Sequence, residues 1–192
     1  FKINEIFLKR LIYVYKPSYI FCEKNKIRND NLYKSILKYK SYILFKRKKN
    51  EENVLNKDLM LLMSTSGTTG SPKFVRQSYL NVLSNTKKII KYLNIKSQDI
   101  TITSLPISYV YGLSVINTHL LAGATIVLTN RSMVEKKFWD LIATFKVNNF
   151  SGVPYNYSII EKISKKGLPS SLKYTTQAGG KMNRILIKNI IN

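Results

Sequence analysis

The chain has 192 residues, 44% of them apolar, with 32 Lys and Arg against 10 Asp and Glu, a formal net charge of +22. This length and apolar content suffice for a packed core, which excludes a disordered tail. The single cysteine, Cys22, excludes an internal disulfide and a multi-thiolate zinc site, and no apolar run approaches the roughly 18 residues of a membrane span. We therefore expect a cytoplasmic protein without stable membrane insertion.

The excess of positive charge suggests a nucleic-acid partner at first. Lysine supplies 26 of the basic residues, however, whereas phosphate and base recognition favour the forked guanidinium of arginine. The lysines are scattered, and the tyrosines show no spacing that would stack successive bases. A basic nucleic-acid-binding protein is kept as an alternative, and no nucleic acid is expected among the partners.

The first third of the chain predicts helices and strands in alternation. Residues 4–17 carry apolar side chains at helical spacing and end at a proline, which predicts a helix. Short β-branched and aromatic runs at 18–22 and 42–46 predict strands, and the lysine-rich segment 31–40 between them predicts a helix. The continuous apolar run 59–63 predicts a strand covered on both faces.

The rest of the chain keeps this alternation. Ser78 is suited to cap a helix over 79–94. Strands are then predicted at 99–104, 124–128, 150–153 and 172–176, and helices at 113–121, 134–146, from Pro154 onward and at 183–191. The pattern predicts an α/β fold, a mostly parallel sheet with helices on both faces.

The segment 64–73, STSGTTGSPK, contains almost no side chain that could pack. Its two glycines let backbone N–H groups approach a ligand closely, and its hydroxyl groups and Lys73 add further donors. Such a run of donors suits a polyphosphate, because charge-assisted hydrogen bonds contribute about 1.5–3 kcal/mol each. The P-loop motif does not fit, since Pro72 replaces its second glycine and Phe74 its metal-binding hydroxyl. A flexible surface turn is the alternative, and the apolar strand before the segment argues against it.

This segment resembles the phosphate-binding signature of the adenylate-forming (AMP-binding) enzymes, which include the acyl-coenzyme A synthetases. In that family an apolar strand precedes S/T-S-G-T-T-G-x-P-K-G. Positions 65–73 match, whereas Phe74 departs from the last glycine; downstream, Ser78 and Asn81 match and Tyr79 replaces a histidine. The resemblance implies that Thr68 and Lys73 are catalytic and that the ATP phosphates are bound by Thr65, Ser66, Gly67, Thr68, Thr69, Gly70 and Lys73.

Later blocks follow the family's order. Residues 105–113 resemble its L-P-x-x-H-x-x-G-L block, with Tyr109 at the histidine or aromatic position that borders the acyl pocket. Residues 152–160 and 172–180 resemble its V-P helix start and its adenine loop, with Lys181 in place of the usual proline. The resemblance implies an acyl pocket at Tyr109, Gly112, Val153 and Pro154, and an adenine site at Ala178, Gly179 and Gly180.

The activity implied is ATP-dependent activation of a carboxylic acid to an acyl-adenylate. A thiol, of CoA or of the phosphopantetheine on an acyl carrier protein, would then accept the acyl group. The protein mainly positions groups and neutralises charge in such a phosphoryl transfer. The resemblance also implies Mg²⁺, but the family's magnesium-binding glutamate belongs to a block absent from this sequence, so no metal ligand is assigned within it.

The resemblance covers nearly the whole chain. We therefore expect residues 1–192 to be part of the large N-terminal domain of such an enzyme, truncated at both ends, without the C-terminal domain and inactive alone. An amino-acid-activating adenylation domain is the second alternative. Between Thr101 and Thr129 the chain has no acidic residue to pair a substrate ammonium, and an unpaired ammonium would be costly to bind. A simple carboxylic acid is favoured.

Overall fold

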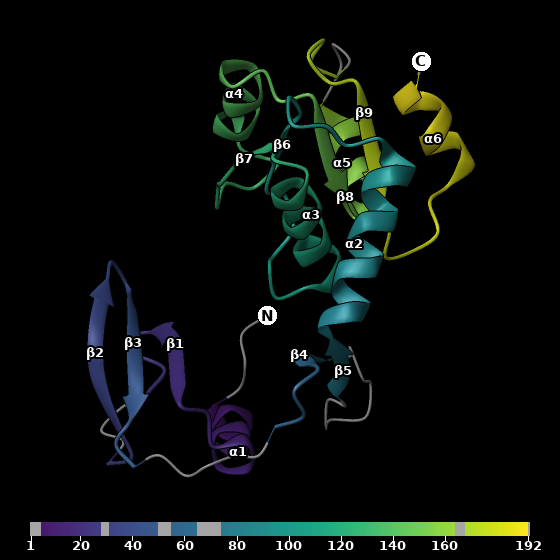
Figure 1. The fold of residues 1–192 in the computed structure, drawn as a ribbon. Helices are drawn as coiled ribbons and strands as arrows, with labels where there is room; N and C mark the ends of the chain where they lie inside the picture. Colours follow the sequence, from purple (N-terminus) through teal and green to yellow (C-terminus); the bar gives the residue numbers. More distant parts are fainter. Residues whose placement is uncertain (1–4, 28–30, 50–54, 65–73, 164–167, 192) are drawn as a thin grey trace. The chain divides into compact units, whose positions relative to one another are not determined.

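The computed structural model describes residues 5–27, 31–49, 55–64, 74–163 and 168–191. The chain divides into two compact units, Phe1–Lys57 and Asp58–Asn192, whose elements are traced in Figure 1. None of the helices within the described residues is both long and apolar enough to cross a membrane.

The described residues of the first unit form one helix and a three-stranded antiparallel sheet. The helix is α1 (Glu5–Tyr15), and the strands β1 (Tyr19–Glu23), β2 (Tyr33–Tyr39) and β3 (Tyr42–Arg47) lie in the order β1-β3-β2. The Tyr33 hydroxyl donates to the carbonyl of Pro17 over 2.7 Å, and the Arg47 guanidinium donates to the carbonyl of Lys16 over 3.2 Å. Both bonds tie the sheet to the turn that follows α1.

The helix predicted over residues 31–40 is wrong, because this segment forms β2. The strand pairs with β3 along its length, from Tyr33 opposite Arg47 to Tyr39 opposite Tyr42. A bulge between Ser35 and Leu37 inserts one extra residue. The bulge breaks the two-residue alternation by which a strand is recognised, so the sequence pattern was misleading here.

The second unit begins with a hairpin of β4 (Leu59–Ser64) and β5 (Phe74–Ser78), followed by α2 (Tyr79–Leu93). The prediction that residues 59–63 are covered on both faces is wrong, since β4 is paired antiparallel with β5 and the Met60 side chain is 42% exposed. The predicted cap is confirmed. The Ser78 hydroxyl accepts from the backbone N–H of Asn81 and the Asn81 side chain accepts from the backbone N–H of Ser78, a capping box.

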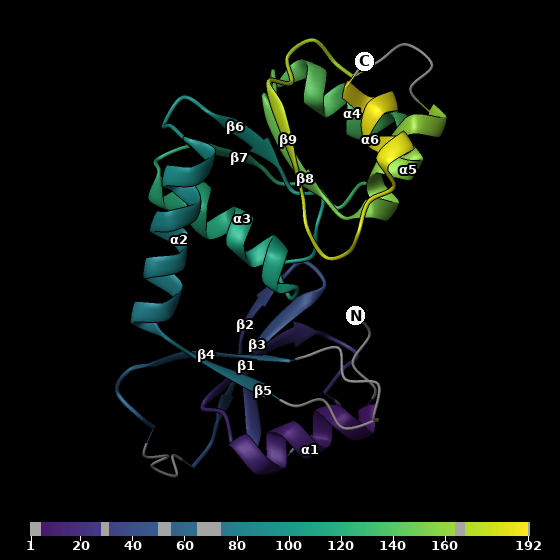
Figure 2. The same ribbon diagram turned by 90° about the vertical axis from the view of Figure 1, so that its right-hand side faces the viewer.

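A four-stranded parallel sheet forms the rest of the second unit. Its strands lie in the order β7-β6-β8-β9, and every pair is parallel. Figure 2 shows α2 and α3 on one side of this sheet and α4, α5 and α6 on the other. The predicted α/β fold is confirmed for this unit. The elements are β6 (Ile100–Ile102), α3 (Val110–Leu121), β7 (Thr125–Val127), α4 (Lys136–Thr144), β8 (Asn149–Gly152), α5 (Pro154–Ile163), β9 (Tyr174–Gln177) and α6 (Arg184–Ile191).

The apolar core lies between the parallel sheet and the layer of α4, α5 and α6. It is built from buried residues of three strands, the three helices and nearby loops: Ile102, Val127, Met133, Phe138, Ile142, Val147, Phe150, Tyr157, Ile160 and Leu186. On the α3 side of the sheet the contacts are more polar. The imidazole Nε2 of the buried His119 lies 3.1 Å from Asn149 Oδ1, which joins α3 to β8. The only histidine is therefore a polar packing residue, as its place in an apolar helix indicates.

Candidate functional site

The order of the strands in the parallel sheet reverses between β6 and β8. From β6 the chain passes through α3 to β7 on one side, and from β8 it passes through α5 to β9 on the other. Ligands of open α/β sheets bind outside the carboxyl ends of the two strands where the connections diverge in this way. The residues that follow β6 and β8 are therefore the place to look for a site.

Five of the residues predicted for the acyl pocket and the adenine site come together at this edge. Tyr109 is the N-cap residue of α3, while Val153 and Pro154 follow β8. A Cβ atom added to Gly179 would lie 2.7 Å from the Tyr109 hydroxyl oxygen and 3.3 Å from Val153 Cγ1, and one added to Gly180 would lie 3.3 Å from Pro154 Cγ. Residues far apart in the sequence thus border one another across β8 and β9.

The two glycines leave a shallow backbone surface. Gly179 has φ +86°, a conformation that L side chains rarely adopt, and Ala178, Gly179 and Gly180 are all exposed. The Gln177 side-chain amide donates to the carbonyl of Gly180 over 2.7 Å, which holds the turn in place. A flat ring could lie against such a surface, whereas a Cβ atom on Gly179 would collide with Tyr109.

Gly112, also predicted for the acyl pocket, lies against the segment that leaves β6. It is buried in the first turn of α3, and a Cβ there would overlap the carbonyl group of Pro106. Its missing side chain allows α3 to pack against the segment that leaves β6. This contact positions Tyr109, whose backbone N–H donates to the carbonyl of Pro106 over 3.0 Å.

A group of hydroxyl residues joins the carboxyl ends of the strands, and sequence reasoning missed it. Thr176 Oγ1 lies 2.7 Å from the Tyr111 hydroxyl and 2.8 Å from Ser151 Oγ, while the Tyr157 hydroxyl donates to the Thr176 carbonyl over 2.6 Å. Ser104 Oγ donates to the carbonyl of Ser151. The only signal in the sequence is that two of the predicted strands, 99–104 and 172–176, end at Ser104 and Thr176.

Acidic groups are absent from the described segments that follow β6, β8 and β9 at this edge, residues 103–109, 153 and 178–183. Asp99 lies just before β6 in the sequence and therefore at the opposite edge of the sheet. There its carboxylate accepts from Lys96 N (2.9 Å) and Asn148 Nδ2 (3.1 Å). Within the described residues no three His, Cys, Asp or Glu side chains gather into a group that could hold a metal ion.

The predicted phosphate-binding residues, Thr65 to Lys73, lie outside the described residues. The strands on either side of them are well defined. Ser64 at the end of β4 pairs with Phe74 at the start of β5, so the two ends of the segment lie side by side. The hairpin leads directly into α2, whose first turn is fixed by the capping box described above.

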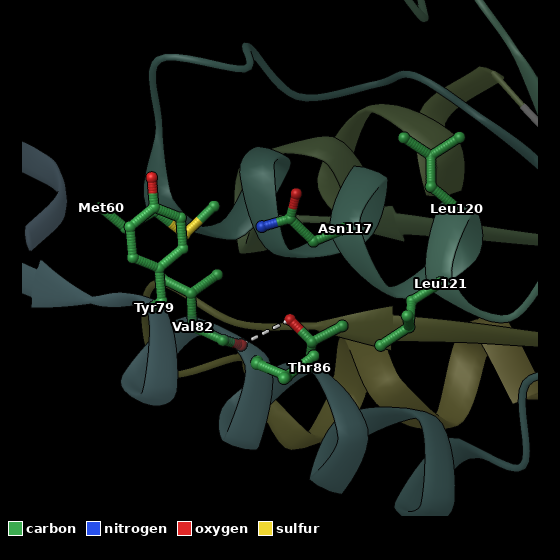
Figure 3. Close-up of a pocket in the computed structure, with 8 residues that line it drawn as sticks. Met60, Tyr79, Val82, Thr86, Asn117, Leu120 and Leu121 are labelled. Atoms are coloured by element: carbon green, nitrogen blue, oxygen red, sulfur yellow. Dashed lines mark hydrogen bonds between the residues drawn. The ribbon is translucent and has the colours of Figure 1, made fainter. Parts of the chain in front are cut away.

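A hollow of about 470 Å³, separate from the residues at this edge of the sheet, lies between β4, α2 and α3 (Figure 3). Its lining is apolar except for Asn117 and Thr86, and the Thr86 hydroxyl already donates to the Val82 carbonyl over 2.7 Å. The other lining residues are Met60, Tyr79, Val82, Leu83, Leu120 and Leu121. Of the predicted site residues that the structure describes, none lines this hollow, and its described lining offers no charged group to a carboxylate or a phosphate.

Known proteins are similar to this chain in sequence and in fold. Residues 14–190 match the family model of the AMP-binding enzymes. An acyl-CoA synthetase of Alternaria alternata is 31% identical over 137 residues, 69% of this chain and 24% of the relative. A 2-succinylbenzoate–CoA ligase of Staphylococcus epidermidis is 30% identical over 132 residues, 68% of this chain and 27% of the relative.

Among solved structures, the O-succinylbenzoate coenzyme A synthetase of Bacillus subtilis in complex with ATP and magnesium is similar. It has a TM-score of 0.61 and 29% identity, over 67% of this chain and 26% of the synthetase. The chain thus spans about a quarter of the length of these relatives. The match to the family model extends over most of the sequence, and the chain belongs to the AMP-binding enzyme family.

Proposed function

We propose that these residues belong to the N-terminal domain of a longer ATP-dependent ligase, which converts a carboxylic acid into an acyl-adenylate and passes the acyl group to a thiol. The observation that carries the proposal is the contact of Tyr109 and Val153 with Gly179 at the carboxyl edge of the parallel sheet. It supports an acyl pocket that lies beside an adenine surface. The acyl group and the adenine ring belong to one acyl-adenylate molecule, so the two sites must lie close together.

ATP fits this arrangement through the residues of two segments. The exposed backbone at Ala178, Gly179 and Gly180 suits one face or edge of adenine. The phosphates would be held by residues 65–73, with Thr68 and Lys73 as the leading side chains, because this segment offers many donors and no carboxylate. Donors that follow the growing charge of the leaving pyrophosphate stabilise the transition state more than the ground state.

The acid is proposed to lack an ammonium group. The residues near Tyr109 and Val153 supply hydroxyl groups and apolar surface. Of the acidic residues between 98 and 180 (Asp99, Glu135, Asp140 and Glu161), only Glu135 lies in a segment that directly follows a strand, β7, and it already accepts from the backbone N–H of Ser132 and pairs with Arg131. An amino acid would bring a charge without a partner into the pocket. This supports a simple carboxylic acid over an amino acid.

Coenzyme A is the favoured acceptor, because the similar proteins are named as CoA ligases and synthetases. A carrier-protein phosphopantetheine is the second candidate. Magnesium would accompany ATP, but within the described residues no three His, Cys, Asp or Glu side chains gather into a group that could hold it. No step is therefore assigned to the metal.

The test is a pyrophosphate-exchange assay on the full-length protein, with ATP and a panel of fatty, aryl and amino acids. We expect exchange to depend on a carboxylic acid, and Lys73→Ala to lower it by about tenfold or more, the loss of one charge-assisted contact. Lys88→Ala, an exposed lysine of α2, is the matched control. Equal exchange in both variants, or exchange only with amino acids, would contradict the proposal.

A further inference from the structure

One face of the antiparallel sheet in the first unit gathers aromatic and basic side chains. Partners in the ladders share a face, so Tyr19 and Phe21 of β1 lie on the same side as Tyr42 and Lys46 of β3. Because the bulge shifts β2 by one residue, Lys34 and Tyr39 also lie on this side. We call these six residues, with Leu37 and Leu44 between them, the aromatic face.

The aromatic face is the exposed side of the sheet. Phe21 is 59% and Tyr39 60% exposed, whereas Ile43 on the opposite side is buried. The rings of Phe21 and Tyr42 are stacked with centroids 5.2 Å apart. Large aromatic side chains held in place and left in contact with solvent indicate a binding surface.

Positive charge borders these rings. Lys46 Nζ lies 5.7 Å from the ring centroid of Tyr19, and Lys40 Nζ lies 5.4 Å from that of Tyr39. Lys34 and Lys46 stand directly opposite each other in the β2–β3 ladder. Like charges in such a pair destabilise a sheet, and an anion bound between them would remove that cost.

The charge also selects among partners. Residues 1–57 contain 15 Lys and Arg against 5 Asp and Glu. A second copy of the chain, docked face to face about a two-fold axis parallel to the strands, would bring like-charged lysines together. A purely apolar partner would leave Lys34 and Lys46 without a counter-charge. One acidic residue, Glu23, lies on this face opposite Tyr42, at the end away from the lysine pair.

We propose that the aromatic face binds single-stranded nucleic acid. Aromatic rings on each of three strands, in rows about 4.8 Å apart, offer stacking positions for more than one base, and the lysine pair at one end of the face matches a phosphate backbone. Composition alone indicated no such partner. The helix predicted over residues 31–40 gave no reason to expect Lys34 opposite Lys46 or Tyr39 opposite Tyr42, because these pairs form only when the segment is a strand.

The experiment measures binding of a fluorescent ten-residue oligo(U) to the 192-residue chain by anisotropy. We expect Tyr39→Ala and Tyr42→Ala to weaken binding about tenfold each, and the affinity to fall steeply between 50 and 200 mM salt. Lys46→Ala should reduce the dependence on salt. Tyr92→Ala, which removes an exposed ring of α2, is the matched control and should bind as the unaltered chain does.

Three results would overturn the inference. Duplex RNA could bind as well as the single strand, which would show attraction to charge alone. ATP or CoA could displace the oligonucleotide at concentrations near their own affinities, which would show a mononucleotide site. Tyr39→Ala and Tyr42→Ala could instead abolish self-association in sedimentation while leaving RNA binding unchanged. Lys73→Ala should not alter RNA binding, so the proposal stands or falls separately from the ligase function.

Discussion

The Tyr109 hydroxyl stands 2.7 Å from where a Cβ atom on Gly179 would be. Gly179→Ala should therefore displace the tyrosine as well as strain a backbone that has φ +86°. We expect the variant to lose about tenfold in affinity for ATP in a calorimetric titration, because the proposed acyl and adenine surfaces would no longer meet.

Two variants separate this contact from the backbone strain. Gly123 also has a positive φ (+72°), but a Cβ there would lie 3.7 Å from Ser97 Cβ, an ordinary contact. Gly123→Ala should cost stability and leave ATP affinity unchanged. Tyr109→Phe removes the hydroxyl that the added methyl group would meet, and it should restore part of the affinity that Gly179→Ala loses. Equal losses of affinity in the Gly123 and Gly179 variants would show that strain alone is responsible.

The capping box at the start of α2 gives a second prediction. Ser78→Ala removes the acceptor for the backbone N–H of Asn81, 3.0 Å away, and should lower the free energy of unfolding by about 0.5–2 kcal/mol. Urea denaturation measures this change. Asn85→Ala, an exposed position inside the same helix, should have little effect. If both variants lose the same stability, the cap does not fix the helix start.

How far the sequence predicts the structure depends on whether a feature is local. The helix starts at Ser78 and Pro154 and the strands of the parallel sheet each depend on a few adjacent residues, and the sequence pattern was sufficient for them. β2 was missed because one bulged residue, Ile36, hides its alternation from any count of period two.

The hydroxyl group around Thr176 could not be predicted for another reason. Its members Ser104, Tyr111 and Ser151 are separated from Thr176 by 25 or more residues. They meet only because β6, β8 and β9 lie side by side in parallel, so that the carboxyl ends of the strands share one edge. Strand order is set by the whole fold and is not written in any single segment.

The cluster of hydroxyl residues around Thr176 should contribute to the stability of the fold. Thr176→Val keeps the shape of the side chain but leaves Tyr111 and Ser151 without their shared partner, so we expect a loss of about 1–3 kcal/mol in the free energy of unfolding. Thr125→Val on the exposed edge of β7 is the matched substitution and should be nearly neutral. A neutral Thr176 variant would show that water replaces the lost partner.

Tyr157 and Tyr174 should respond in opposite ways to loss of their hydroxyl groups. Tyr157→Phe breaks a 2.6 Å hydrogen bond to the Thr176 carbonyl and should lower the free energy of unfolding by about 1 kcal/mol. Among the described residues the buried Tyr174 hydroxyl has no hydrogen-bond partner. Tyr174→Phe should therefore be neutral or stabilising, because it removes a polar group that is buried at a cost. Parallel urea titrations decide the sign, and destabilisation of the Tyr174 variant would reveal a bound water.

The same two tyrosines should make stability depend on pH in the alkaline range. Burial raises the pKa of Tyr157 to about 12 and that of Tyr174 to about 12. In the unfolded chain a tyrosine releases its proton near pH 10, so between pH 10 and 12 the unfolded state holds fewer protons than the folded state. The free energy of unfolding must then fall as pH rises, whereas below pH 10 neither tyrosine contributes a slope.

Each Tyr→Phe variant should flatten the decline measured by urea titration from pH 9 to 11, and the double variant should flatten it most. If all the slopes match that of the unaltered chain, these hydroxyls ionise as readily in the folded protein as in the unfolded one.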